Sequence, residues 1–170
     1  DFGCVDGLYY LAMEYVEGRD LAQIAGRARI AQKTWPTEVA ILVALEILEG
    51  LDYAHERHDE SGRPLHIVHR DISPANIIVG DDGTAKIVDF GVAKGTTNTL
   101  ATQSGMLKGK FSYMAPEMLG GATPQISART DVYLLGAVLY EILCGRPPHE
   151  GDTLMELVRS IARSQPDFPE

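Results

Sequence analysis

The chain has 170 residues and a formal net charge of −9 at pH 7. Its 45% apolar and 23% charged residues are typical of a globular domain with a sizeable core, and the acidic balance argues against a nucleic-acid partner. The longest apolar run, 132–144, is too short and too interrupted to cross a membrane, so we expect a cytoplasmic segment without membrane contact. Cys4 and Cys144 lack metal-ligand spacing and are expected to be reduced thiols.

The first half of the chain predicts a buried strand and two helices. Residues 8–13 form an apolar, aromatic run behind an Asp-Gly turn signal, which favours the strand. Helical spacing begins at 19–21, and a longer helix follows Trp35-Pro36 with Thr37 as its N-cap. The apolar face of that helix is predicted to contain Val39, Leu42, Val43, Ile47, Leu51 and Ala54.

The second half predicts a hairpin and two more helices. Residues 76–79 and 85–88 are β-like runs joined by Gly80-Asp81-Asp82-Gly83, a turn sequence. Residues 95–110 are polar and show no periodic pattern. The helices are predicted at 130–143, mostly apolar and buried, and at 152–163, amphipathic.

Three short strings stand in order along the chain. His69-Arg70-Asp71 is followed by Asn76, then come Asp89-Phe90-Gly91 and Ala115-Pro116-Glu117. Together, with a Thr-rich loop between the last two, they resemble the catalytic half of a protein kinase. The variant Ser73-Pro74 resembles catalytic loops of bacterial, eukaryotic-like serine/threonine kinases.

The resemblance covers essentially the whole chain and implies an α+β, protein-kinase-like fold. Residues 1–17 would be the end of the small lobe and the hinge. Residues 18–170 would be a mostly helical large lobe without its final helices. The chain contains no Gly-rich loop and no strand lysine of the V-A-I-K type, so we expect the isolated segment to be inactive.

The resemblance also assigns the catalytic residues. Asp71 would be the base that accepts the proton of the attacking hydroxyl, and Asn76 and Asp89 would hold Mg²⁺. His69 and Phe90 would be core residues that link the lobes. The other histidines, to which we assign no chemistry, are His55, His58, His66 and His149.

ATP would bind at the hinge. By position, Met13 would be the gatekeeper, and the backbones of Glu14 and Val16 would hydrogen-bond the adenine. Asp20 would lie near the ribose. Ile78 would pack under the adenine ring, and plain strand burial is its alternative role.

Three supporting residues are implied as well. Arg70 would receive a phosphate on the activation loop, where Thr102 or Ser104 is the expected site; a merely solvated loop is the alternative. Asp131 would hydrogen-bond the backbone of the catalytic loop, and Glu117 would pair with an arginine outside the chain. The hydroxyl residues of the activation loop are Thr96, Thr97, Thr99, Thr102 and Ser104.

The sequence departs from the family pattern at the transferred phosphoryl group. The lysine that serine/threonine kinases place two residues after the catalytic aspartate is Ser73, and the arginine of tyrosine kinases is Ala75. Lys110 replaces a threonine that normally sits against the catalytic aspartate. We therefore hypothesise that Lys110 supplies the missing cation, with a surface lysine and weakened catalysis as the competing interpretation.

These observations favour a protein serine/threonine kinase that uses ATP and Mg²⁺, acts on a protein substrate and is open to autophosphorylation in trans. The alternative is a pseudokinase or ATP-binding scaffold, for which Ser73 is the argument. Small-molecule kinases of the same fold are a third possibility, against which Ala115-Pro116-Glu117 stands.

Overall fold

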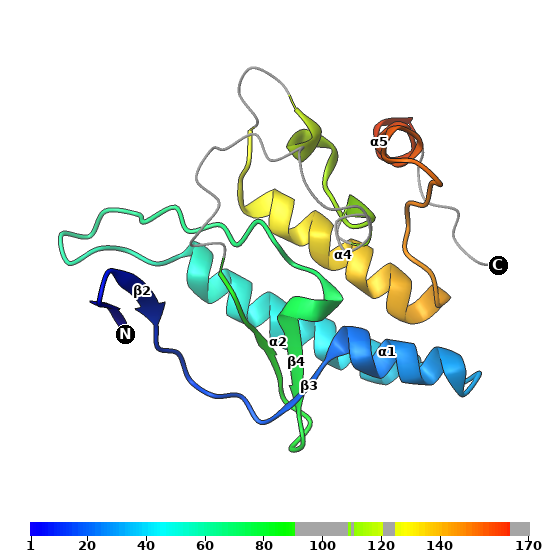
Figure 1. The fold of residues 1–170 in the computed structure, drawn as a ribbon, viewed down its shortest axis with the longest axis horizontal. Coiled ribbons are helices and arrows are strands. Elements are labelled where there is room, and N and C mark those ends of the chain that lie inside the picture. The colour runs from blue at the N-terminus through cyan, green and yellow to red at the C-terminus, as the bar shows by residue number, and fades with distance from the viewer. Residues whose placement is uncertain (91–108, 110, 121–124, 164–170) are drawn as a thin grey trace.

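Two long helices form the centre of the molecule. The computed structural model describes residues 1–90, 109, 111–120 and 125–163, and in it α2 (Thr37–His55) packs against α4 (Ala128–Cys144). Helix α1 (Leu21–Ile30) lies beside one end of this pair, and α5 (Leu154–Arg163) lies beyond α4 (Figure 1). The helices predicted from the sequence are thus confirmed, with ends shifted by a few residues.

Two small antiparallel sheets complete the fold. Strands β1 (Phe2–Val5) and β2 (Leu8–Leu11) form a hairpin. Strands β3 (Gly18–Asp20), β4 (Ile77–Gly80) and β5 (Ala85–Ile87) form the second sheet in that order. The predicted hairpin of residues 76–88 and the α+β class are therefore confirmed, and β5 contacts α2.

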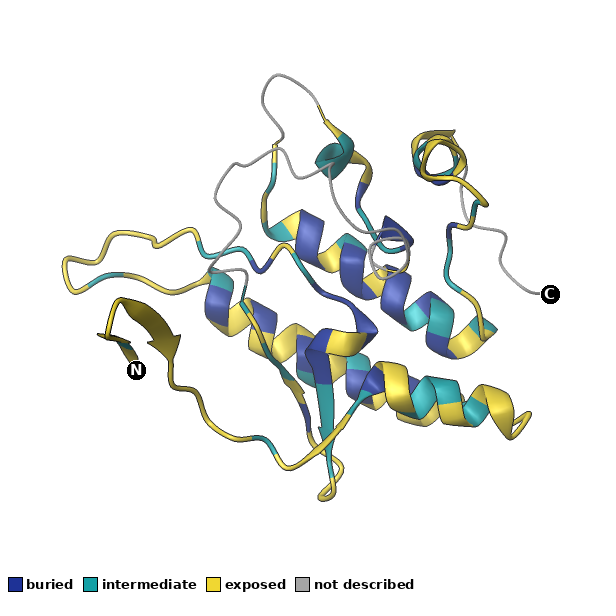
Figure 2. Cartoon of the chain, viewed as in Figure 1, coloured by how far each residue is buried: buried dark blue, intermediate teal, exposed yellow. Residues whose placement is uncertain are grey.

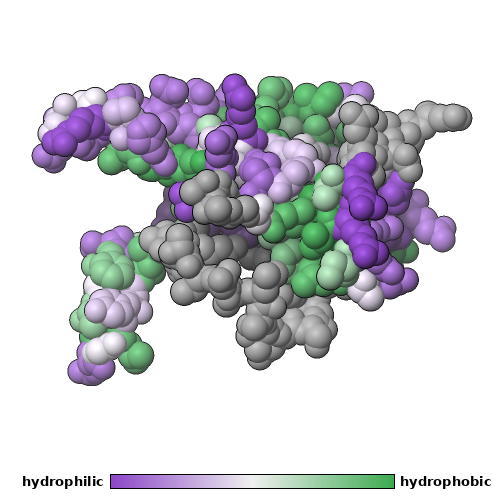
Figure 3. All heavy atoms as spheres, turned by 90° about the horizontal axis from the view of Figure 1, so that it is seen from above, coloured by the Kyte–Doolittle hydropathy of each residue, from purple (hydrophilic) through white to green (hydrophobic). Residues whose placement is uncertain are grey.

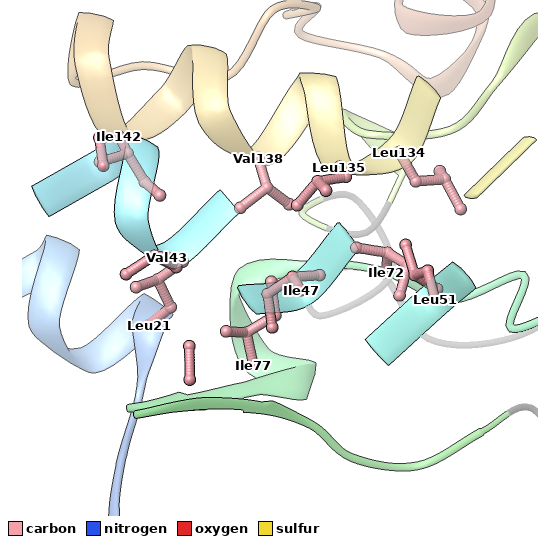
Figure 4. Packing of buried hydrophobic residues seen from close by; sticks show 12 residues of the cluster. Leu21, Val43, Ile47, Leu51, Ile72, Ile77, Leu134, Leu135, Val138 and Ile142 are labelled. Carbon is pink, nitrogen blue, oxygen red and sulfur yellow. The ribbon is translucent and has the colours of Figure 1, made fainter. Parts of the chain in front are cut away.

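The main core lies between α2, α4 and the second sheet. Helix α2 contributes Val43, Ile47 and Leu51, which are four residues apart and share one face. Side chains from α4 meet them from above, and Ile72 and Ile77 meet them from the loop and sheet side (Figure 4). The buried stripes of both helices face one another (Figure 2).

Helix α2 differs from its sequence prediction in two details. Pro36, not Thr37, occupies the N-cap position, and no side chain caps this end. Val39 and Leu42 are 40% and 61% exposed, so assigning them to the buried face was wrong. The buried face runs through Ala40, Val43, Ile47, Leu51 and Ala54, and α4 and β5 are elements that contact the helix.

The predicted burial of the N-terminal strand was also wrong. The strand exists as β2, but all four of its residues are exposed, with Leu8 at 77%. Among the described residues its only sheet partner is β1, which the sequence did not predict. In Figure 3 this hairpin stands apart from the body of the molecule with apolar side chains on its surface.

Both ends of α4 have defined caps. Ser127 and Thr130 form a capping box, and Gly145 ends the helix at φ 71°, a left-handed conformation that glycine adopts without strain. No helix in the described ranges is long and apolar enough to span a bilayer.

Candidate active site

The loop that carries Asp71 is anchored on a buried carboxylate. Asp131, fully buried in the first turn of α4, accepts hydrogen bonds from the backbone N–H groups of His69 and Arg70, both at 2.8 Å. Arg70 has a φ of 64°, so its backbone conformation is one that non-glycine residues seldom adopt. The predicted bonding of Asp131 to this loop is confirmed.

A third group on Asp131 was missed by the sequence analysis. His55 Nε2 lies 2.8 Å from Asp131 Oδ2, so the last turn of α2 also binds the carboxylate. The available signal was spacing, since His55 lies four residues after Leu51 on the buried face of α2. Three donors around one buried charge fix its position relative to both central helices.

His69 connects the two catalytic strings. It is fully buried, packs against Phe90 at 4.6 Å between ring centroids, and its Nε2 lies 3.1 Å from the Val88 carbonyl. The N–H of Asp71 points to His69 Nδ1 at 3.2 Å, so Nδ1 accepts and Nε2 donates, which defines a neutral tautomer. Burial lowers the pKa of His69 and favours that neutral form. The predicted burial of His69 is confirmed, whereas Phe90 is only partly buried and the proposed link between lobes stays a prediction.

Asn76 joins the loop to the strand that leads into Asp89. The side-chain amide nitrogen Nδ2 of Asn76 donates to the backbone carbonyl of Asp71 at 2.7 Å, and the backbone carbonyl of Asn76 accepts from the Val88 N–H at 3.0 Å. Val88 directly precedes Asp89, so the hydrogen bonds of Asn76 join Asp71 to the residue that leads into Asp89.

These residues offer oxygen donors suited to a divalent cation. Asp89 is exposed at a φ of 59°, and Asn76 is 7% exposed with its amide nitrogen bound to Asp71. This orientation leaves the amide oxygen of Asn76 as its acceptor. One carboxylate and one amide suit Mg²⁺, which takes its other ligands from phosphate and water.

The hinge residues fall into two groups. Asp20 pairs with Ile78 across strands β3 and β4, so these two nucleotide-binding candidates are neighbours. The Asp20 carboxylate also caps α1 by accepting from Gln23 N–H at 2.8 Å, a structural role that the sequence analysis did not foresee.

Glu14 and Val16 lie on the strand-free connection between β2 and β3. The Glu14 carboxylate is 2.6 Å from Lys86 Nζ, and this hydrogen bond raises the pKa of Lys86. The pair ties the connection to β5 beside Ile78. Met13 is 59% exposed.

Ser73 is buried where the family places a lysine. It is 4% exposed, and its hydroxyl has no hydrogen-bond partner among the described residues. Lys110 and the hydroxyl residues of 96–104 lie outside the described residues. Arg70 is exposed beside the catalytic loop.

Glu117 has a partner within the chain. Its carboxylate accepts from the Thr130 hydroxyl at 2.7 Å, and Thr130 is fully buried in the first turn of α4. The segment that carries Ala115-Pro116-Glu117 is thereby fixed to the same helix end as the catalytic loop. Whether Glu117 also pairs with an arginine outside the chain stays a prediction.

Comparison with known proteins places this site in a family. The protein kinase domain family matches residues 5–168, nearly the whole chain. The chain therefore belongs to the protein kinase domain family.

Several bacterial kinases are similar over most of the chain. The tyrosine-protein kinase MasK of Myxococcus xanthus is 35% identical over 181 residues, covering 100% of this chain and 27% of its own length. The serine/threonine-protein kinase PknH of Mycobacterium tuberculosis is 39% identical over 160 residues, covering 94% and 23%. The probable serine/threonine-protein kinase PknB of Lactococcus lactis is 32% identical over 179 residues, covering 100% and 26%. The chain spans about a quarter of the length of these relatives.

Proposed function

We propose that this chain is the catalytic segment of a bacterial protein kinase that transfers the γ-phosphoryl group of ATP to serine or threonine hydroxyls of proteins. The observation that supports the proposal is that Asn76 hydrogen-bonds both the Asp71 carbonyl and the N–H of Val88, the residue before Asp89. A module without phosphotransfer has no need for all three, so this arrangement favours an active enzyme over the scaffold alternative.

In this proposal each residue has a defined task. Asp71 accepts the proton of the attacking hydroxyl and orients its oxygen toward the phosphorus. Asn76 and Asp89 hold Mg²⁺, which neutralises phosphate charge when bound. Because Asn76 binds the Asp71 backbone, the base and the metal ligand move as one unit.

ATP would occupy the space between the hinge and β4. The backbones of Glu14 and Val16 would bind the adenine, with Ile78 under the ring and Asp20 near the ribose. The pairing of Asp20 with Ile78 on β4 and the contact of Glu14 with Lys86 on β5 support this, because both tie the predicted hinge segment to the sheet that contains Ile78.

Lys110 is proposed as the cation at the transferred phosphoryl group. Ser73 occupies the position of the usual lysine and its short side chain carries no charge. Lys110→Ala should then reduce kcat about a hundredfold while the KM for ATP changes little, because a cation that acts on developing charge affects the transition state most. Equal kcat in the two proteins would show that Lys110 is a surface residue.

Phosphate transfer from labelled ATP tests the function. The protein should be the complete kinase domain, with the Gly-rich loop and strand lysine that this chain lacks, beside its Asp71→Asn variant and an Asp59→Asn control. We expect the Asp71 variant to lose at least a hundredfold in rate and the control to keep its rate. Transfer that survives in the Asp71 variant, or that is absent from the folded parent, would contradict the proposal.

The acceptor hydroxyl needs its own measurement. One relative carries the name of a tyrosine-protein kinase, so tyrosine is the second candidate. Acid hydrolysis of the labelled product separates phosphoserine and phosphothreonine from phosphotyrosine. Phosphorylation of one copy by another is tested separately: active protein is mixed with an Asp71→Asn variant of different size, the two are separated on a gel, and label on the variant shows transfer in trans. Arg70 would bind a phosphate added in this way to the activation loop.

A further inference from the structure

A pocket unused by the proposed mechanism lies between α1 and the end of α4. Its volume is about 490 Å³, within the range of binding pockets for small groups. Residues 22–35 form one wall, from α1 to the start of α2, and residues 141–145 form the other. Trp35 lies at the bend between α1 and α2, and its indole nitrogen is buried without an acceptor in the described part of the chain.

The pocket is positive on an acidic protein. Its charged lining residues are Arg29, Lys33 and Glu141, two cations against one anion, whereas the chain carries a net charge of −9. In the described ranges neither Arg29 nor Lys33 forms an ion pair. The Glu141 carboxylate accepts a hydrogen bond from the Tyr113 hydroxyl, which leaves the two cations as the groups open to a ligand.

The same hydrogen bond links the pocket to the acceptor side of the active site. Tyr113 lies two residues before Ala115-Pro116-Glu117, the segment expected to position the protein substrate. Tyr113 is partly buried against the main core. Burial, and secondly the hydrogen bond to Glu141, raise the pKa of its hydroxyl. Tyr113 thereby joins the segment that contains Ala115-Pro116-Glu117 to the α4 wall of the pocket.

We propose that this pocket binds an acidic side chain of the protein substrate, with Arg29 and Lys33 as specificity-determining residues. The inference rests on the proposed kinase function and specifies its substrate class. A glutamate or aspartate near the phosphorylated hydroxyl would lie between the two cations, with its stem against Trp35 and the small residues of α1. The preference for acidic sequences comes from the unpaired positive charges.

Peptide phosphorylation measures this preference directly. Three kinds of serine peptide of equal length would carry two glutamates, two alanines or two arginines within five residues of the serine. Each charged kind is made in two versions, with the pair before or after the serine. The enzyme is the complete kinase domain. We expect kcat/KM about tenfold higher for the glutamate peptide than for the arginine peptide, mainly through KM, and a smaller ratio at high salt.

Charge reversal distinguishes a direct role from a structural one. Arg29→Glu with Lys33→Glu should reverse the ranking, so that the arginine peptide has a higher kcat/KM than the glutamate peptide. Arg27→Glu is the matched control, because Arg27 is exposed on the same helix and does not line the pocket. An unchanged preference in the double variant, or the same reversal in the control, would overturn the inference.

Cys144 gives a second measurement that needs no catalysis. It lines the pocket and is partly exposed, and Cys4→Ser removes the other thiol. The glutamate peptide should slow alkylation of Cys144 severalfold, and the arginine peptide should not. Equal rates of Cys144 alkylation with the glutamate and arginine peptides would contradict the proposed site. If none of the peptides is phosphorylated but the glutamate peptide still protects Cys144, only the proposed kinase function is contradicted.

Discussion

The catalytic loop and the N-terminal hairpin are built on opposite principles. The loop has irregular backbone and few apolar residues, yet a buried carboxylate with three donors fixes it to the two central helices. The hairpin has regular strands and many large apolar residues, yet it buries almost none of them. Regular secondary structure therefore does not identify the well-anchored part of this molecule, whereas contact with the α2–α4 core does.

The largest loss in the free energy of unfolding is expected from removing the Asp131 carboxylate that anchors the loop. Asp131→Ala leaves two backbone N–H groups and His55 without their acceptor in a buried site, so we expect a loss of about 3–5 kcal/mol in the free energy of unfolding. Urea denaturation at pH 7 measures it. Asp131→Asn keeps one acceptor oxygen and should lose less. A loss below about 1 kcal/mol in Asp131→Ala would show that the carboxylate does not hold the loop.

Equal truncations of one residue type compare the two regions directly. Leu51 is 1% exposed in the core and Leu8 is 77% exposed in the hairpin. Leu51→Ala should destabilise by about 2–5 kcal/mol, and Leu8→Ala should change the free energy of unfolding by no more than about 0.5 kcal/mol. The same urea experiment applies to both. Similar losses at the two positions would mean that the hairpin is packed in solution.

A pH titration of stability tests the buried histidines. His149 is 1% exposed between the Tyr133 hydroxyl at 3.0 Å and the Ser160 hydroxyl at 3.2 Å, and burial lowers its pKa. Just below pH 6.5 the unfolded state therefore binds a proton at His149 that the folded state does not bind. Stability should be complete above pH 6.5 and should fall as the pH decreases below it, by up to about 1.4 kcal/mol per pH unit for each such histidine.

His149→Gln should flatten that decrease, with His69 contributing the remainder through its own lowered pKa. His58→Gln is the control, because His58 is exposed. If both variants show the same pH dependence as the parent, His149 does not carry the effect.

The smallest effect is expected at the hinge. Lys86 and Glu14 form an exposed pair with side chains 46% and 71% accessible. Lys86→Ala should lower the free energy of unfolding less than any of the variants above, and 1 M salt should reduce that loss further. A cost that persists in salt would indicate that the hinge is held by more than surface charge.

The sequence predicted periodic elements well and burial less well. The four helices and the hairpin around Gly80-Asp81-Asp82-Gly83 follow from spacing and turn residues, which act locally. The exposure of Leu8 and Leu42 could not be read from the sequence, because burial depends on which neighbours cover a residue.

The candidate site shows the same division. Motif strings predicted Asp71, Asn76 and Asp89 as site residues, which stays a prediction, and predicted the bonds of Asp131 to the loop, which is confirmed. They did not predict the contact from His55, which depends on how α2 ends against α4. Asp20 was assigned to the ribose from its position, while its bond to Gln23 shows a helix cap. The sequence pattern alone could not predict a contact between distant residues, such as His55 with Asp131, or a local hydrogen bond such as that of Asp20 with Gln23.

The anchor on Asp131 also has a consequence for hydrogen exchange. The amide protons of His69 and Arg70 point into a fully buried carboxylate and belong to no helix or strand. They can exchange with deuterium only when the loop separates from Asp131 on α4. These two loop amides should therefore exchange slowly although they lie in no helix or strand, and their protection reports how firmly the candidate catalytic loop is held to α4.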